Sequence, residues 1–326
     1  MDPRGFCRQT RLVIVAGKGG VGKTTVSATM ARMASRLGLS SLIVEVEGKK
    51  CLATMFGRPE AVGYEEQVLV PASEAGGIGE VRARTLTPDR ALVEYLQDHG
   101  MGRTSRRLVR SGALDVVSTG VPGIKDILVL GKVKQLESKA VADLIILDTP
   151  AAGHAVTFLM SPRGLLDAVS VGPIQSQAAD VGELLTDPSR CQVMLVTLPE
   201  ETPVNEAVET AFALEERVGA DLGPVVVNGL YPSLEGLDTD PEEAARRAGA
   251  DLAPDDADDL RRAATFRSRR HALQQEQVLR LADSLPLPQL RLPALFEADL
   301  GLAELDRLAD SMLAAVGALE ERPGDR

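Results

Sequence analysis

Near its start the chain carries a stretch whose residue types and spacing suit the binding of a polyphosphate. The stretch reads Gly17-Lys18-Gly19-Gly20-Val21-Gly22-Lys23-Thr24-Thr25, and it fits the phosphate-binding pattern G-x-x-x-x-G-K-[ST]. Glycines let backbone N–H groups turn inward toward phosphate oxygens, and the helix that follows adds the positive end of its dipole. Lys23 is suited to the β and γ oxygens and Thr24 to Mg²⁺. The stretch therefore predicts a site for the phosphates of a nucleotide with Mg²⁺.

The loop holds a second lysine, Lys18, directly after its first glycine. A lysine at this place has no need to contact the nucleotide of its own loop, because Lys23 already supplies that charge. Lys18 is therefore a separate candidate for chemistry.

A candidate metal ligand follows a nearly continuous apolar run at 141–147, which is typical of a central parallel strand covered on both faces. The run ends at Asp148, and Gly153 and His154 come soon after. An aspartate at this point is suited to fix Mg²⁺ or its water. Gly153 can bring a backbone N–H close to a γ-phosphate, so that the segment responds when that phosphate is lost.

The elements that must position these residues alternate between strand and helix, which predicts an α/β fold with a doubly wound, mostly parallel sheet and helices on both faces. Residues 1–326 are expected to form one domain, with a helical insertion at about 87–138 and a helical C-terminal part at about 240–320. Two prolines within 285–292 make that segment an edge strand at best. The other expected strands are 12–16, 42–44, 81–85, 141–147, 193–197 and 225–228.

Composition excludes several functions. The 36 Lys and Arg against 47 Asp and Glu give a net charge of −11, which repels nucleic acid. No apolar run reaches the roughly 18 residues of a membrane span, and the N-terminus lacks the apolar core of a signal peptide, so we expect a cytoplasmic protein. The three cysteines are expected to be reduced thiols, and Cys51 lies close to the expected nucleotide site, with its role left open.

Together these segments resemble the arsenite-pump and tail-anchored-protein-targeting ATPase family. The loop has that family's Gly-Lys-Gly-Gly-Val-Gly-Lys-Thr-Thr form, and residues 148–154 are similar to its second switch. Asn228 stands where the family has its adenine-reading asparagine, and Pro293 is expected to line the same pocket. The resemblance implies Mg²⁺-dependent ATP hydrolysis in a dimer, with Lys18 reaching the phosphates of the other subunit. In the alternative, Lys18 contacts its own phosphate or solvent.

The first switch departs from the family's Ser/Thr-Asp-Pro-Ala pattern, because this chain has Val46-Glu47-Gly48-Lys49. An alignment through Leu52 and 56–57 puts Glu47 on the position of the aspartate that orients the attacking water. Glu45, one pleat away on the same strand face, is the runner-up. The Val-Glu-Val-Glu-Gly form is similar to an actinobacterial branch with paired paralogues, which implies either a homodimer or a heterodimer with a paralogous ATPase.

The resemblance thus implies an ATPase whose nucleotide-switched dimer acts on a partner or cargo, such as a protein client or a membrane partner. Two alternatives stay open, a carrier for membrane-protein targeting and a division-site or partition regulator. The second is less favoured because the last helix lacks a basic amphipathic face. The zinc-binding C-x-x-C of the targeting factors is absent, so association of the subunits is expected to depend on nucleotide.

Overall fold

A computed structural model describes residues 1–46, 50–73, 75–98, 123–150, 154–169 and 172–320. Within them the chain forms an eight-stranded sheet in the order β3-β4-β2-β5-β1-β6-β7-β8. Every neighbouring pair is parallel except the pair of β3 and β4. The strands are β1 (Leu12–Ala16), β2 (Ser41–Val46), β3 (Gln67–Val70), β4 (Val81–Leu86), β5 (Leu144–Asp148), β6 (Cys191–Thr197), β7 (Val225–Leu230) and β8 (Gln289–Pro293). The fold class expected from the sequence is confirmed.

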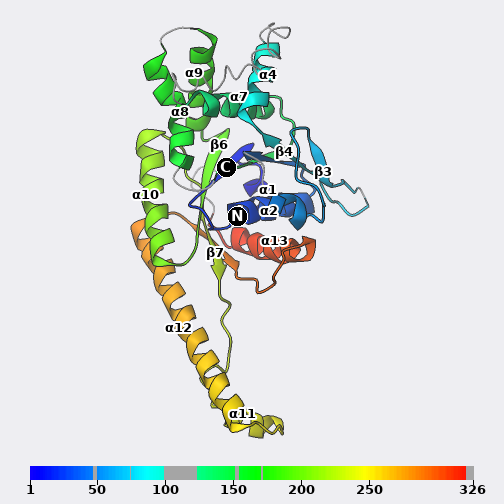
Figure 1. Cartoon of the computed structure of the whole chain (residues 1–326), viewed down its shortest axis with the longest axis vertical. Coiled ribbons are helices and arrows are strands. Elements are labelled where there is room, and N and C mark those ends of the chain that lie inside the picture. Colours follow the sequence, from blue (N-terminus) through cyan, green and yellow to red (C-terminus); the bar gives the residue numbers. More distant parts are fainter. Residues whose placement is uncertain (47–49, 74, 99–122, 151–153, 170–171, 321–326) are drawn as a thin grey trace.

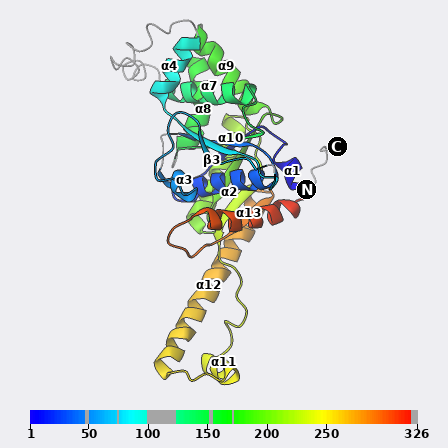
Figure 2. The same ribbon diagram turned by 90° about the vertical axis from the view of Figure 1, so that its right-hand side faces the viewer.

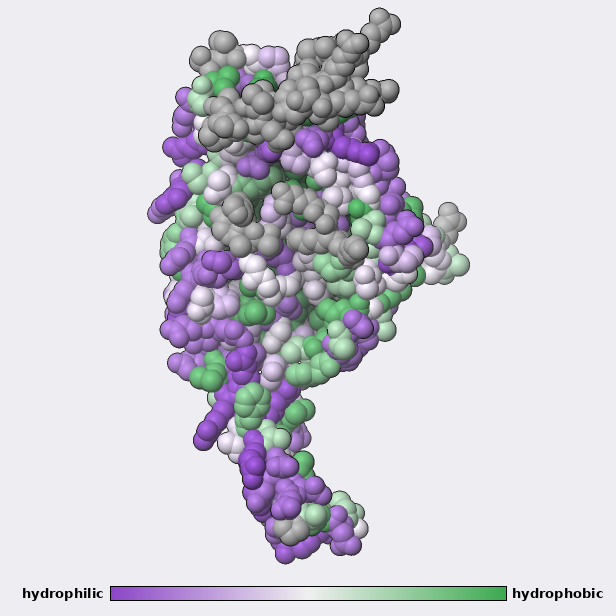
Figure 3. Space-filling model, in the orientation of Figure 1, coloured by the Kyte–Doolittle hydropathy of each residue, from purple (hydrophilic) through white to green (hydrophobic). Residues whose placement is uncertain are grey.

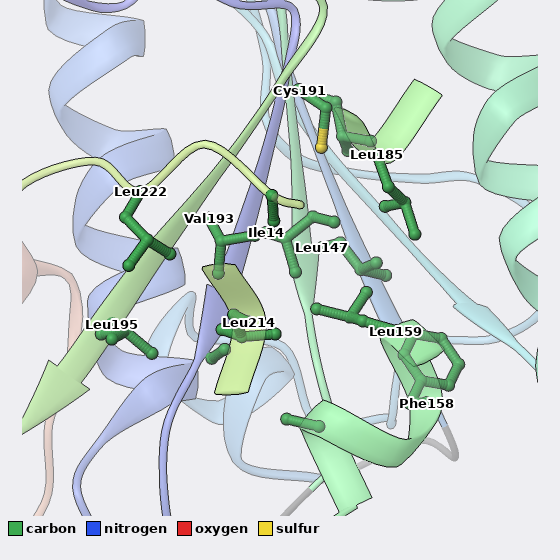
Figure 4. Close-up of a cluster of buried hydrophobic side chains, with 14 of the residues drawn as sticks. Ile14, Leu147, Phe158, Leu159, Leu185, Cys191, Val193, Leu195, Leu214 and Leu222 are labelled. Carbon is green, nitrogen blue, oxygen red and sulfur yellow. The ribbon is translucent and has the colours of Figure 1, made fainter. Parts of the chain in front are cut away.

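Helices cover both faces of the sheet, so the central strands are buried throughout. Leu12 and Ile14 of β1 point into one hydrophobic cluster, and Val13 and Val15 point into the other. Ile14 is fully buried, which contributes about 2–3 kcal/mol for a side chain of this size. Figure 4 shows part of the cluster that contains Ile14. The helices that cover this face are α7 (Ile124–Ser138), α8 (His154–Ala168), α9 (Pro173–Thr186), α10 (Glu201–Arg217) and α12 (Pro254–Ser284).

The opposite face of the sheet is covered chiefly by α2, which begins directly after the glycine-rich loop, and by α13 from the end of the chain. The apolar side of α13 is buried against this core. Because the loop joins β1 to α2, it lies where the central strand meets this helical layer. The bounds on this face are α1 (Pro3–Phe6), α2 (Lys23–Arg36), α3 (Lys50–Met55) and α13 (Leu302–Gly317).

The molecule is elongated, with a helical lobe at one end and a projecting arm at the other (Figures 1 and 2). The lobe consists of α4 (Pro88–Asp98) together with α7, α8 and α9, which pack on one another. The sequence analysis does not anticipate α8 and α9. The arm consists of α11 (Pro241–Ala248) and the first half of α12, and its visible face is mostly hydrophilic with separate apolar residues (Figure 3).

Among the described helices, none is long and apolar enough to cross a membrane. Of the three cysteines, Cys7 and Cys191 are buried and Cys51 is exposed on α3. Burial raises the pKa of the Cys7 thiol to about 12 and the pKa of the Cys191 thiol still further. Both buried thiols therefore stay protonated and unreactive at neutral pH.

Candidate nucleotide site

The glycine-rich loop occupies the carboxyl edge of the sheet, where α/β proteins of this type place their ligand sites. Strand β1 lies between β5 and β6, and Val15 stands opposite Asp148 in the register of β1 and β5. Glu45 of β2 stands opposite the same Asp148 from the other side. The strand register therefore gathers the loop and two carboxylates at one edge of the sheet.

Backbone geometry requires glycine at two positions of the loop. Gly17 has φ 149°, and a Cβ there would lie 2.3 Å from the carbonyl oxygen of Val196. Gly22, directly before the first turn of α2, has φ 91°. A Cβ on Gly22 would lie 2.3 Å from the side-chain amide of Asn228. No side chain caps α2, and the positive end of its dipole at the loop favours an anion. Lys18, Gly19 and Gly20 form the exposed tip of the loop.

Three of the predicted residues meet at the start of α2. The Lys23 Nζ donates hydrogen bonds to the carbonyl oxygens of Gly17 at 2.9 Å and Lys18 at 3.1 Å. The Thr24 hydroxyl donates to Asp148 Oδ2 at 2.6 Å. All three side chains are buried. Lys23 thus holds its charge over the loop. Mg²⁺ prefers hydroxyl and carboxylate oxygens as ligands, so Thr24 and Asp148 fit this ion.

A second carboxylate is buried beside Asp148. Glu45 is 0% exposed, and it shares a sheet face with Asp148 because the two residues are in register on parallel strands. The Thr85 hydroxyl lies 3.4 Å from Glu45 Oε2 and donates to the Val62 carbonyl at 2.8 Å. Asp148 and Glu45 therefore bring two carboxyl side chains to the same part of the sheet edge.

Not every predicted residue can be placed. Glu47 and Gly153 lie outside the described residues. Val21 is buried below the loop in the core around α2, and Thr25 is half-buried on the first turn of that helix.

The second lysine of the loop is held by a different element. The Lys18 Nζ lies 2.7 Å from Oε1 of Glu206 on α10, and its side chain is 45% exposed. The two residues sit in a groove between α8 and α10 that also contains Glu209 and Arg217. Sequence reasoning missed Glu206, and the signal for it in the sequence was the pair of carboxylates at 206 and 209, which are one turn apart on a helix.

The expected base-binding residues lie at the same edge of the sheet as the loop. The Asn228 side-chain amide donates to the carbonyl oxygen of Val21 at 3.0 Å, so it rests directly against the end of the phosphate loop. Pro293 ends β8 and pairs with Leu230 of β7. Both Asn228 and Pro293 are half-buried, which leaves each of them partly accessible to a ligand.

Comparisons with known proteins point to one family. Residues 10–170 match the model of a family described as anion-transporting ATPase. The chain is 30% identical over 329 residues to ATPase BagA of Mycobacterium tuberculosis, an alignment that covers 93% of this chain and 92% of that protein. It is 29% identical over 241 residues to a putative arsenical pump-driving ATPase of Halobacterium salinarum, with 69% of this chain and 36% of that protein covered.

A third relative is ATPase get3 of Schizosaccharomyces japonicus, 28% identical over 158 residues that cover 48% of this chain and 46% of that protein. The mycobacterial relative agrees with the actinobacterial branch expected from the first switch, and the other two agree with the arsenite-pump and targeting types. With the loop geometry described above, these matches establish that the chain belongs to the anion-transporting ATPase family and is a nucleotide-binding ATPase.

Proposed function

We propose that this chain is a Mg²⁺-dependent ATPase that closes onto a second subunit when ATP is bound and acts on a protein client or other cargo. The observation that carries the proposal is the contrast between the two lysines of one loop. Lys23 is buried and bonded to its own loop, whereas Lys18 is 45% exposed and held by α10. An exposed ammonium beside the cradle supports a contact with phosphates bound by the other subunit, as an arginine finger supplied in trans would make.

The predicted site residues divide the chemistry among themselves. Thr24 and Asp148 would hold Mg²⁺, which when bound neutralises charge on the phosphate oxygens. Lys23 and the positive end of the α2 dipole bind and orient the polyphosphate. Glu47 orients the attacking water, with Glu45 as the runner-up, and Gly153 responds to the loss of the γ-phosphate.

Association switched by nucleotide follows from the same arrangement. ATP favours the closed pair only through contacts that the closed pair alone provides, and Lys18 is proposed to make one of them. Lys18 must leave Glu206 to do so. Because that ion pair is solvent-exposed, releasing it costs less than about 1 kcal/mol. The pairing subunit is either a second copy or a paralogous ATPase.

Two features of the structure bear on the alternatives. A cavity of 520 Å³ between α4, α7 and α9 has charged residues on its walls, among them Glu94, Lys132 and Asp180. Glu94 and Asp180 pair with lysines of α7, and apolar residues such as Leu128 also line the cavity, so it suits a client that has both apolar and polar groups. The apolar side of α13 is already buried against α2 and the sheet, which argues against its use as the membrane anchor of a division-site regulator.

Analytical ultracentrifugation with Mg²⁺ and a non-hydrolysable ATP analogue tests the proposal. The wild type should assemble only with the analogue, and its turnover per chain should rise with protein concentration. Lys18→Ala should lose both properties. Arg217→Ala, which removes another exposed charge from the same groove, serves as the matched control and should behave as the wild type. Equal assembly and equal turnover in the wild type and Lys18→Ala would refute the role given to Lys18.

The same measurement identifies the kind of partner. A chain that assembles alone with the analogue forms a homodimer. A chain that stays monomeric until a paralogue captured from cell extract is added forms a heterodimer. Extracts prepared with the analogue also reveal whether apolar helices co-isolate with the protein, which would favour the carrier for membrane-protein targeting.

A further inference from the structure

A buried glutamine on α12 holds the turn that follows the expected adenine-reading residue. Gln274 is 2% exposed. Its Nε2 donates a hydrogen bond to the carbonyl oxygen of Gly229 at 3.1 Å, and its Oε1 accepts one from the backbone N–H of Tyr231 at 2.8 Å. One side-chain amide therefore bridges the two residues on either side of Leu230, directly after Asn228.

The backbone at this point needs such a partner. The pairing of β7 with β8 shifts register between Val227 and Leu230, and Gly229 has φ 74°. An irregularity of this kind re-aims a side chain and takes backbone groups out of the regular ladder. Gln274 satisfies the displaced groups in the way that a neighbouring strand otherwise would. The direction in which Asn228 points is thus tied to a residue on a separate helix.

Arg267, also on α12, contacts the segments that follow β7 and β8. Arg267 lies two turns before Gln274, and its guanidinium donates to the carbonyl oxygen of Pro232 at 3.2 Å. The guanidinium carbon lies 4.3 Å from the ring centre of Tyr231 and 4.9 Å from that of Phe296, and the two rings meet edge to face at 5.2 Å. Phe296 follows Pro293 by three residues, so both walls of the expected base pocket are anchored to α12.

We propose that Gln274 is a positioning residue that holds Asn228 in the orientation that selects adenine over guanine. The inference rests on the proposed function, because it requires Asn228 to contact the base. An asparagine amide offers one donor side and one acceptor side, and a base with the opposite pattern leaves those groups unpaired. Discrimination of this kind depends on a fixed amide orientation. The Val21 carbonyl holds the Asn228 amide itself, and Gln274 holds the backbone that carries it through the Gly229 turn.

Binding measurements with three ligands separate base recognition from phosphate binding. Dissociation constants for ATP, GTP and inorganic tripolyphosphate, each with Mg²⁺, are compared in the wild type, Gln274→Leu and Gln274→Met. Loss of the two hydrogen bonds that Gln274 makes should lower the preference for ATP over GTP about tenfold, equivalent to about 1.4 kcal/mol. The affinity for tripolyphosphate should not change. Gln275→Leu is the matched control, because Gln275 is half-buried and contacts His271 of its own helix.

Gln274→Met covers the case in which the leucine variant does not fold, because it keeps the length of the side chain while losing both the donor to Gly229 and the acceptor for Tyr231. A combination with Asn228→Ala provides a readout that a merely structural role would not move. In the Asn228→Ala background, Gln274→Met should cause no further loss of base preference.

Two outcomes overturn the inference while leaving the proposed function in place. One is an unchanged preference for ATP in a Gln274→Met protein with the wild-type circular dichroism spectrum. The other is an equal loss of affinity for all three ligands, which would make Gln274 a general support of the site. A wild type that binds tripolyphosphate but shows no preference between ATP and GTP would instead remove the base-reading role of Asn228 itself.

Discussion

The ion pair between Lys18 and Glu206 makes the proposed closing step measurable. If Lys18 must leave Glu206 in order to reach the phosphates of the other subunit, then Glu206→Gln should release it in advance and strengthen assembly. The effect must exceed that of another carboxylate in the same groove, because each chain has a net charge of −11 and the loss of any surface carboxylate lowers the repulsion between two copies.

The size of the effect follows from the exposure of the pair. The two charged atoms lie 2.7 Å apart, and the side chains are 45% and 26% exposed. Because solvent screens the charges, such an ion pair contributes a favourable free energy of about 0.5 kcal/mol. Both subunits of a symmetric pair lose this contact on closing, so the substitution in both copies favours assembly by about 1 kcal/mol, or about fivefold in the dissociation constant.

Sedimentation velocity over a range of protein concentrations, with Mg²⁺ and the ATP analogue, gives that constant. Glu209→Gln is the matched control, because Glu209 lies one turn along α10 in the same groove and carries the same charge. The difference in dissociation constant between Glu206→Gln and Glu209→Gln should decrease at about 1 M salt, where the screening length falls to about 3 Å. Equal or weaker assembly of Glu206→Gln relative to Glu209→Gln would refute the reasoning.

Three further substitutions test the site. Lys23→Ala should abolish nucleotide binding or turnover with the fold intact, because it removes the charge that is held over the loop. Isothermal titration with ATP measures the binding, and normal ATP hydrolysis would overturn the assignment. Asp148→Asn should raise the Mg²⁺ concentration needed for half-maximal phosphate release while retaining much of the ATP affinity, and wild-type rates at low Mg²⁺ would contradict it. Glu47→Gln should bind ATP but hydrolyse it at least ~10²-fold more slowly; a slow Glu45→Gln beside a normal Glu47→Gln would transfer the water-orienting role to Glu45.

Much of the fold could be predicted because its signals are local. The apolar run of β5 indicated a strand buried on both faces, and the prolines before β8 indicated an edge strand, which is where β8 lies. The helices α8 and α9 were not predicted. Pro162 stands inside α8, where proline weakens a helical pattern, and the stability of both helices depends on packing against α7, which the local pattern does not encode.

The sequence by itself determined the phosphate loop, because its glycines, Lys23 and Thr24 are contiguous and their roles follow from local backbone geometry. Asp148 was predictable for a related reason, since a residue that ends a central parallel strand must lie at the ligand-binding edge of the sheet. Only the tertiary structure decided that Lys18 meets Glu206 and that Gln274 holds the turn after Asn228. These partners are far apart along the chain, and whether they meet depends on how each helix crosses the sheet, which is a property of the whole packed core.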